Sequence, residues 1–402
     1  MSKIKVAIIG GGASGLFAAS MLGKDNIEVC IFEKNNKLGK KILASGNGKC
    51  NFTNVGDYID KYNSDFANKI VDKFSVKSTL NEFSKMGLVY KEDDQGRCYP
   101  VSESATSVLE CLKLNLNNVT IKLECLVKNI DINKNRVCVE YNNESDFFDY
   151  VICCSGSSAS NLGSEKAYNY LNDLGVKITP IRSSLTPIVV KEDVKSLFGV
   201  RVKCLMNLMD SKNNVVYSEK GEIVFKENGL SGIAIFNATS YINRKLDKYK
   251  ISLDLSCDMK EKELISYFKN KKTNNLFTGF LNDKLALYIY KRCEVDKYSH
   301  LDDQLVLKIV KIIKNLQFNL IELYPLKDSQ VCSGGVSINE VDDNLKLKKY
   351  PSIYVAGELL DVDGVCGGYN LQFAWSSGAV IAKDILNRIK NMWHKSHVFV
   401  IQ

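Results

Sequence analysis

The sequence predicts an α/β fold in two parts: a domain of parallel strands and helices formed by both ends of the chain, and an insert of antiparallel strands and helices. Three observations predict it. A strand, a glycine turn, a helix and a second strand that ends on an acid open the chain. From about residue 185 the pattern changes to short alternating strands, and in the last third strand–glycine–helix signals return. Together they indicate a Rossmann-like domain that binds a dinucleotide, then an antiparallel β unit that is open or barrel-like, then helices, with one cofactor held from both ends of the chain.

The opening turn carries the glycine fingerprint of dinucleotide-binding proteins. Residues 3–9 (KIKVAII) are an apolar, β-branched run typical of a buried strand, and small and apolar residues at helical spacing follow. Between them, Gly10 permits a tight turn, Gly12 lets the backbone approach a pyrophosphate, and Gly15 lets the helix lie close to the strands. The start of the helix offers unpaired N–H groups and the positive end of its dipole to the pyrophosphate.

The second strand completes the fingerprint. Residues 27–32 (IEVCIF) form it, and it ends on Glu33, which lies 18 residues beyond Gly15. A carboxylate at this place accepts hydrogen bonds from an adenosine ribose. The glycine hexapeptide alone recurs by chance in glycine-rich loops, but two strands, a helix and an acid in register favour a nucleotide site.

Composition places the chain among ordinary globular proteins. Of its 402 residues, 45% are hydrophobic and 25% are charged, with a formal net charge of +8. The Lys residues are dispersed, so a solvated surface is favoured over a nucleic-acid partner. No run resembles a transmembrane span, and the apolar run in residues 1–10 is too short for a signal peptide. We therefore expect no nucleic acid and no membrane, while the oligomeric state stays open.

Thirteen cysteines stand at irregular spacings, many of them inside apolar, strand-like runs. Their number is odd and no CxxC motif occurs, which argues against a disulfide framework, a zinc site and a thioredoxin-type couple. We therefore expect free thiols, no metal and a cytoplasmic protein.

Further elements of the same domain lie between the second strand and residue 185. A loop at 37–51 is rich in Gly, Lys and Asn, which suits phosphates or the edge of a cofactor and equally suits a flexible basic surface. The expected elements are helices at 65–88 and 103–116, a hairpin at 119–141, and a strand at 148–154 that Ser155-Gly156 closes.

The middle of the chain predicts a separate insert. Short alternating strands from about Leu185 to Asp254 indicate a small antiparallel β unit, open or barrel-like. Helical periodicity then extends to Asn315, with a wide apolar face in its last helix. The expected boundaries are 1–185 for the first part of the nucleotide-binding domain, 186–257 for the β unit, 258–324 for the helical subdomain and 325–402 for the second part.

The last third returns to glycine-rich turns. Residues 353–356 (IYVA) form a short buried strand that runs into Gly357-Glu358, and Asp361 lies three residues further on. A second glycine turn then opens a helix at Leu371. Asp361 or Glu358 can bind ribityl or phosphate-bridging groups, while the helix start directs N–H donors at an anion. In a flavin that anion is the N1/C2-oxygen locus, which gains charge on reduction.

These residues resemble the BaiN-type NAD(P)/FAD-dependent oxidoreductases, a family of two-dinucleotide-fold flavoproteins that includes an aminoacetone oxidase and a 3-dehydro-bile-acid reductase. The matching stretches are IIGGGASGL at 8–16, KLGKKILASGNGKCNFTN at 37–54, GRCYPVS at 96–102, GLSGIAIF at 229–236, SGGVS at 333–337 and GELLDVDGVCGGYNLQFAWSSG at 357–378. One departure is the stretch Cys154-Ser155-Gly156-Ser157-Ser158, which lacks the double glycine and the following Ser-x-Pro of the family pattern.

The resemblance implies a glutathione-reductase-like FAD domain that is discontinuous, in agreement with the changes of pattern near 185 and 325. No His or Cys stands in a recognisable flavinylation context, so we expect non-covalent FAD. Carried over by motif, the FAD contacts fall on Gly10, Gly12, Ala13, Ser14, Gly15, Glu33, Lys34, Lys40, Val127, Gly357, Asp361, Asn370 and Leu371. No catalytic acid or base can be carried over, and His300, His394 and His397 all lie outside the motifs.

The resemblance thus implies an FAD-dependent oxidoreductase that transfers a hydride between flavin N5 and a small organic substrate. NADH or NADPH is the favoured electron donor, as in a reductase of an activated double bond, and an O2-dependent amine oxidase is the alternative. No second complete GxGxxG occurs, so a pyridine nucleotide would dock transiently. A tRNA-modifying flavoprotein is a third possibility, for which clustered Arg and a basic C-terminal domain are missing.

Overall fold

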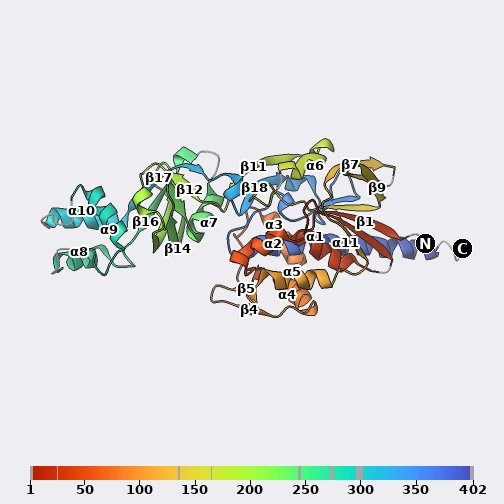
Figure 1. Cartoon of the computed structure of the whole chain (residues 1–402), viewed down its shortest axis with the longest axis horizontal. Coiled ribbons are helices and arrows are strands. Elements are labelled where there is room, and N and C mark those ends of the chain that lie inside the picture. The colour runs from red at the N-terminus through yellow and green to blue at the C-terminus, as the bar shows by residue number, and fades with distance from the viewer. Residues whose placement is uncertain are drawn as a thin grey trace. The chain divides into compact units, whose positions relative to one another are not determined.

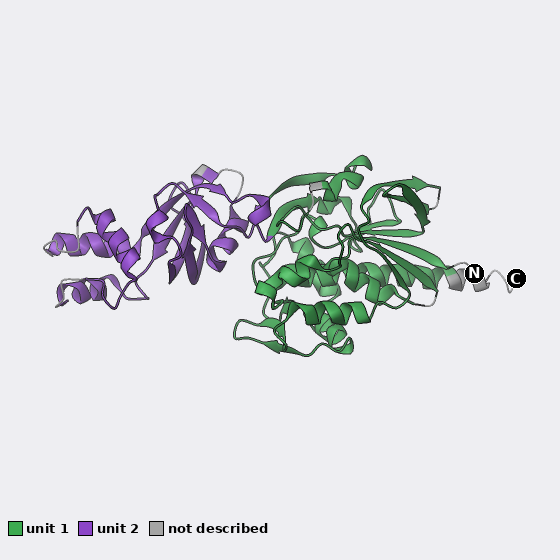
Figure 2. Cartoon of the chain, in the orientation of Figure 1, with its two compact units in different colours: residues 1–182, 331–402 green, residues 183–330 purple. Residues whose placement is uncertain are grey.

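The computed structural model describes residues 3–24, 26–134, 136–163, 165–242, 246–271, 276–295 and 302–398. The chain divides into two compact units (Figure 2): residues 1–182 with 331–402 form unit 1, and residues 183–330 form unit 2. Each unit has a hydrophobic core of its own. Unit 1 therefore uses two distant stretches of chain, and unit 2 is an insertion between them.

Unit 1 contains most of the elements that matter for a nucleotide site. Its strands are β1 (Ile4–Ile9), β2 (Ile27–Phe32), β3 (Thr53–Asn54), β4 (Tyr90–Glu92), β5 (Arg97–Pro100), β6 (Val119–Lys122), β7 (Val127–Asn133), β8 (Arg136–Tyr141), β9 (Glu144–Phe148), β10 (Tyr150–Cys153), β11 (Ile178–Ser184), β18 (Val331–Val336) and β19 (Ile353–Val355). Its helices are α1 (Ala13–Leu22), α2 (Lys40–Ala44), α3 (Asp65–Lys73), α4 (Val76–Lys85), α5 (Ala105–Leu114), α6 (Asn169–Asp173) and α11 (Tyr369–Val398).

A five-stranded parallel sheet in the order β19-β10-β1-β2-β6 is the centre of unit 1. β1 pairs with β2 on one side, Ile4 opposite Ile27, and with β10 on the other, Val6 opposite Tyr150. The chain leaves β1 toward β2 while β10 lies on the opposite side. Such a switch point, at the carboxyl ends of the strands, is where open α/β sheets bind their ligands.

Helices α1 and α11 pack against each other beside this sheet (Figure 1). The sequence of α1, ASGLFAASML, is small and apolar around its whole circumference, as is typical of a helix that is buried on all sides. A Cβ on Gly378 of α11 would lie 2.5 Å from the carbonyl oxygen of Ser14. Small residues at these places let the two helix backbones approach closely.

Two of the expected elements differ in detail. The helix expected at 65–88 is two helices. The first ends at its C-cap Phe74, and the Ser75 hydroxyl caps α4 by accepting from the N–H of Ser78. Within the hairpin expected at 119–141, only β7 and β8 pair antiparallel, whereas β6 pairs parallel with β2 in the main sheet. Glu124, at a φ of +51°, redirects the chain between β6 and β7.

Unit 2 is a closed barrel with helices. The barrel order is β12 (Ile188–Val190), β15 (Gly229–Ser231), β14 (Val215–Phe225), β13 (Arg201–Met209), β16 (Lys250–Asp254) and β17 (Leu316–Leu323), and its helices are α7 (Ile233–Tyr241), α8 (Glu261–Lys269), α9 (Asp283–Cys293) and α10 (Asp303–Lys314). β17 lies in the range expected to be helical, and it closes the barrel by pairing with β12. The predicted fold class, a Rossmann-like sheet with a β-barrel-like and helical insert, is confirmed.

Three general properties bear on function. All thirteen cysteines lie in the described part of the chain and carry free thiols. Among the described residues, no group of three or more His, Cys, Asp or Glu is arranged to hold a metal ion. The helices in those same residues include none with the length and apolar character to cross a membrane.

Candidate cofactor site

The turn between β1 and α1 needs glycine at two positions for reasons internal to the protein. Gly10 has a φ of +113°, and a Cβ on it would lie 2.3 Å from the carbonyl oxygen of Cys154, the residue after β10. A Cβ on Gly15 would lie 2.2 Å from the carbonyl oxygen of Gly10. These two glycines let the turn after β1 pack directly on the turn after β10.

Gly12 is different, because no protein atom would clash with a side chain at this position. Its φ of −90° and ψ of −164° are extended backbone that any residue adopts, and no protein atom lies within 4 Å of where a Cβ would stand. Gly12 is also the N-cap of α1, and no side chain caps this helix, which begins at Ala13 and Ser14. The first-turn N–H groups therefore stand beside open space suited to an anion such as a pyrophosphate.

Glu33 is buried at the end of β2, where protein groups hold its carboxylate. Oε2 accepts from the N–H of Gly11 at 2.8 Å, and Oε1 accepts from the N–H and side-chain amide of Asn35 at 2.8 and 2.6 Å. Glu33 thus ties the end of β2 to the glycine turn, and only its remaining lone pairs are open to a ribose. Its carbonyl accepts from the N–H of Cys125, two residues before the buried Val127.

Three lysines gather around the loop after β2. Lys34 donates to the carbonyl oxygen of Gly163 at 2.8 Å, and Lys40 donates to Asn35 Oδ1 at 3.1 Å. Burial lowers the pKa of Lys34; Glu33 opposes this effect, and the charges of Lys41 and Lys40 add to it. Cations that repel one another in this way stabilise an anion placed among them.

Side chains of the second glycine-rich turn, between β19 and α11, are already bonded to protein. Asp361 accepts from the N–H of Gly334 at 3.0 Å and from the Thr179 hydroxyl at 2.7 Å. Asn370 accepts from the N–H of Gly364 at 2.8 Å and donates to the carbonyl of the same residue at 2.7 Å. Both residues expected to contact FAD therefore support β18 or the loop before α11, and the backbone at the start of α11 is left for a ligand.

The two glycine-rich turns lie side by side. Gly357 has a φ of +63°, and a Cβ on it would lie 2.7 Å from the hydroxyl of Ser14 in α1. The N–H of Gly357 donates to the Ser377 hydroxyl at 3.0 Å, and Leu371, in the first turn of α11, packs partly buried on the core. One site can therefore be formed by turns that are more than 300 residues apart in the chain.

Lys41, which the sequence did not single out, joins helix α2 to the segments after β10 and β19. Lys41 Nζ lies 2.9 Å from Glu358 Oε2 and 3.2 Å from the Ser157 hydroxyl. Lys41 follows β2, Ser157 follows β10 and Glu358 follows β19, so the three meet at the carboxyl edge of the sheet. Spacing could not separate Lys41 from its neighbour Lys40 in a Lys-rich loop.

Next to Glu358 lie a buried thiol and a buried phenol. Cys332 is 1% exposed, and its Sγ is 3.8 Å from the hydroxyl of Tyr168. Burial first, and the Glu358 carboxylate second, raise the pKa of Cys332 to about 12. The thiol keeps its proton at neutral pH and does not reach the surface, so we assign it to the support of β18. His300 and the side chains of His394 and His397 lie outside the described residues.

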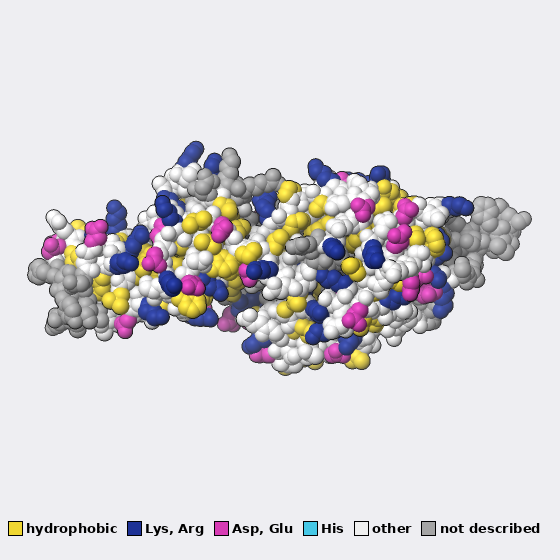
Figure 3. Space-filling model, turned by 45° about the horizontal axis from the view of Figure 1, so that its top comes forward, with side chains coloured by type: hydrophobic (Ala, Val, Ile, Leu, Met, Phe, Trp, Pro, Cys, Tyr) yellow, Lys and Arg dark blue, Asp and Glu magenta, His cyan; other side chains and the backbone are white. Residues whose placement is uncertain are grey.

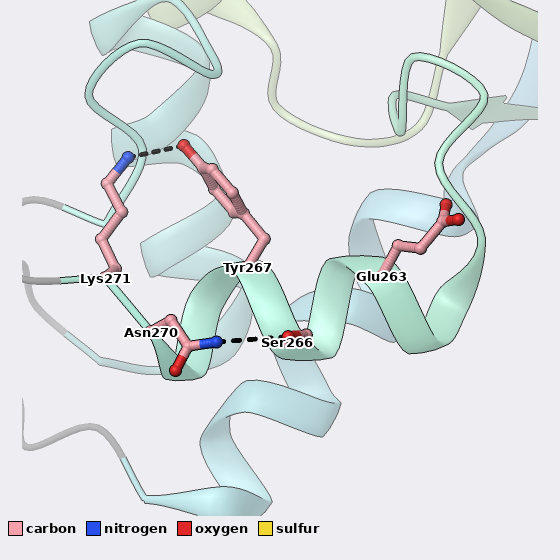
Figure 4. Close-up of a pocket in the computed structure, with 5 residues that line it drawn as sticks. All are labelled: Glu263, Ser266, Tyr267, Asn270 and Lys271. Carbon is pink, nitrogen blue, oxygen red and sulfur yellow. Dashed lines mark hydrogen bonds between the residues drawn. The ribbon is translucent and has the colours of Figure 1, made fainter.

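A separate hollow of about 540 Å³ lies along α8 in unit 2 (Figure 4). Its lining residues are Glu263, Ser266, Tyr267, Asn270 and Lys271. Lys271 donates to the Tyr267 hydroxyl at 2.6 Å, and the Asn270 amide donates to the Ser266 hydroxyl at 3.2 Å. Glu263 caps its own helix by accepting from the N–H of Lys260. Because these side chains are hydrogen-bonded to one another or to their own helix, we assign the hollow no chemistry.

The family model described as the HI0933-like protein Rossmann domain matches residues 4–384. The chain belongs to the HI0933-like family. The predicted family resemblance is thereby confirmed, and at the level of the family so is the assignment as a Rossmann-fold flavoprotein oxidoreductase.

Two relatives of this HI0933-like chain match it over nearly its whole length. A 3-dehydro-bile acid delta(4,6)-reductase of Clostridium scindens is 28% identical over 408 residues, 96% of this chain and 99% of the relative. A ribosomal RNA dihydrouridine synthase of Escherichia coli is 28% identical over 412 residues, again 96% and 99%. A solved 3-ketosteroid delta1-dehydrogenase of Sterolibacterium denitrificans is 10% identical over 96% of this chain and 100% of that chain, with a TM-score of 0.47.

Proposed function

We propose that this protein is an FAD-dependent reductase that adds a hydride to a carbon–carbon double bond conjugated with a carbonyl group. The observation that carries the cofactor part of the proposal is the open space at Gly12, which the protein does not fill and does not need for its own backbone. A pyrophosphate would lie there against the N–H groups at the start of α1, and the lysines after β2 would supply positive charge. Glu33 supplies the acceptor for the ribose.

The residues present fit FAD held without a covalent bond. Gly10, Gly12, Ala13, Ser14 and Gly15 would hold the pyrophosphate, Lys34 and Lys40 would balance its charge, and Val127 would pack near the adenosine. Gly357 and Leu371 would approach the flavin through backbone groups. Asp361 and Asn370 would shape that end through the bonds they make to β18 and to Gly364.

The names of the relatives support the substrate class. One name describes reduction of double bonds at positions 4 and 6 of a 3-oxo compound, and the other describes the saturation of uridine. Both are alkenes conjugated with a carbonyl group. Such a substrate takes a hydride at the carbon remote from the carbonyl and a proton at the adjacent carbon, while one NADH or NADPH is oxidised through the flavin.

A second candidate is the same reduction on a uridine in RNA, and the excess of basic residues in unit 2 favours it. Residues 183–330 carry 24 Lys and Arg against 18 Asp and Glu, which is most of the net charge of +8. On the face in Figure 3, however, basic and acidic side chains are interspersed. Because binding of RNA rests on clustered basic groups, we favour a small substrate.

The free thiols of the chain support the expectation of a cytoplasmic protein.

The first test concerns the cofactor. The purified protein should be yellow with about one FAD per chain, because the site offers cations and backbone donors but no covalent attachment. Acid precipitation should release FAD into the supernatant. Pigment that stays with the pellet, or FMN in place of FAD, contradicts the proposal.

The second test concerns the electron donor and the substrate. Under anaerobic conditions, NADH or NADPH should bleach the flavin rapidly, and air should reoxidise it slowly. Absence of bleaching with both nucleotides, together with rapid reoxidation in air, would replace the reductase by an O2-dependent amine oxidase. The reduced protein is then offered a free enone and, separately, an rRNA transcript; reoxidation by the transcript alone selects the RNA candidate.

A further inference from the structure

Neighbouring lysines on α2 reach different ends of the site. Lys40 Nζ bonds to Asn35, whose amide bonds to Glu33, at the end expected to hold the ribose. Lys41 Nζ bonds to Glu358, in the turn that leads from β19 toward α11. The start of α11 is where the flavin N1/C2-oxygen locus is expected. Lys41 is therefore bonded to the loop that leads toward the expected redox end of the site, whereas its neighbour Lys40 is bonded at the ribose end.

Lys41 has a hydrogen-bond donor to spare. An ammonium group has three N–H donors, and Lys41 uses one on Glu358 and one on Ser157. Among the described residues the third donor has no acceptor. The side chains of Lys41 and Glu358 are only 32% and 21% exposed. The Lys41 ammonium group therefore interacts more strongly with a ligand anion than it would at an open surface, where water screens charges.

The position of the ammonium group is fixed from two sides. Glu358 also accepts from the N–H of Cys332 at 3.4 Å, which anchors the carboxylate on β18. Ser157 is fully buried, and its hydroxyl also accepts from the N–H of Ala159 at 3.1 Å. Because Glu358 and Ser157 are each bonded to the backbone, the Lys41 ammonium group does not have to move when a nearby charge changes. Such preorganised charges stabilise a developing charge most effectively.

We propose that Lys41 stabilises the reduced form of the bound flavin, and that Glu358 holds Lys41 in place and moderates its charge. This inference rests on the proposed function. Two-electron reduction with uptake of one proton leaves a negative charge near N1 and the C2 oxygen of the flavin, so a fixed ammonium group there favours the reduced form. Lys41 acts through the position of its charge, and Glu358 is the positioning residue that holds it.

The test is the reduction potential of the bound FAD, measured on the holoprotein by equilibration with a reference dye. In Lys41→Met, the preference of the protein for reduced over oxidised flavin should fall about tenfold, which lowers the potential of a two-electron couple by about 30 mV. In Glu358→Gln, the cation loses its counter-charge, so the potential should rise. Lys40→Met is the matched control: it should weaken FAD retention and leave the potential unchanged.

A merely structural ion pair predicts a different pattern. Lys41→Met and Glu358→Gln would then destabilise the protein alike and would not move the potential in opposite directions. Lys41→Arg keeps the charge and should keep the potential, and with Glu358→Gln it decides the question if Lys41→Met does not fold. Equal shifts in Lys41→Met and Lys40→Met, or no rise in Glu358→Gln, overturn this inference alone. A wild-type protein that binds no FAD overturns the proposed function as well.

Discussion

The two glycine-rich turns of unit 1 lie side by side but offer different groups to a ligand. The turn after β1 leaves open space at Gly12, where a side chain would otherwise stand. The turn after β19 carries polar side chains, of which Asp361 and Asn370 are already bonded to protein groups. A polar residue in a cofactor motif can therefore be a support for the site, while the ligand meets the backbone beside it.

The largest expected effect separates two glycines of the first turn. Gly12→Val should lower FAD affinity by at least about 100-fold, or roughly 3 kcal/mol, because the side chain fills the open space. The stability of the FAD-free protein should change little, since no protein atom lies within 4 Å of the new Cβ. Flavin fluorescence titration measures the affinity, and urea unfolding measures the stability.

Gly10→Val is the matched control. Its Cβ would lie 2.3 Å from a carbonyl oxygen at a φ of +113°, so strain and overpacking, roughly 1–3 kcal/mol each, should lower the stability of the FAD-free protein. If Gly12→Val unfolds as readily as Gly10→Val, or binds FAD as the wild type does, the space at Gly12 is not a pyrophosphate site.

Glu33→Ala should have an intermediate effect. Charge-assisted hydrogen bonds to the ribose contribute roughly 1.5–3 kcal/mol each, so FAD affinity should fall by about 10- to 100-fold. The fold should persist in circular dichroism, because Glu33 stands at the end of β2 and the apolar strand remains. Full FAD occupancy of the variant after dilution would remove Glu33 from the site.

The smallest effect belongs to the second turn. Asn370→Ala loses two hydrogen bonds to Gly364, so the FAD-free protein should lose about 1–2 kcal/mol of stability in urea unfolding. Asn387→Ala, an exposed position on the same helix, should change stability by less than about 0.5 kcal/mol. If Asn370→Ala keeps wild-type stability but loses FAD, Asn370 is a direct ligand. The two turns would then not differ in whether their side chains contact the ligand.

Sequence reasoning was strongest where the relevant residues are close together in the chain. The fingerprint from β1 to Glu33 spans one strand–helix–strand unit, and its glycines stand where the backbone needs them or where space is left. It was weaker for the insert, because β17 closes the barrel by pairing with β12, far away in sequence. A short apolar run after an amphipathic helix does not show locally whether it continues the helix or pairs as a strand.

By itself, the sequence determined the fold class, the family and the place of the first turn, because each depends on contiguous patterns of apolar residues and glycines. Only the tertiary structure decided which polar side chains remain for a ligand. Lys41 is 116 positions from Ser157 and 317 from Glu358, and they meet because β2, β10 and β19 end at one edge of one parallel sheet. Such a meeting depends on strand order and register, which no local pattern of residues encodes.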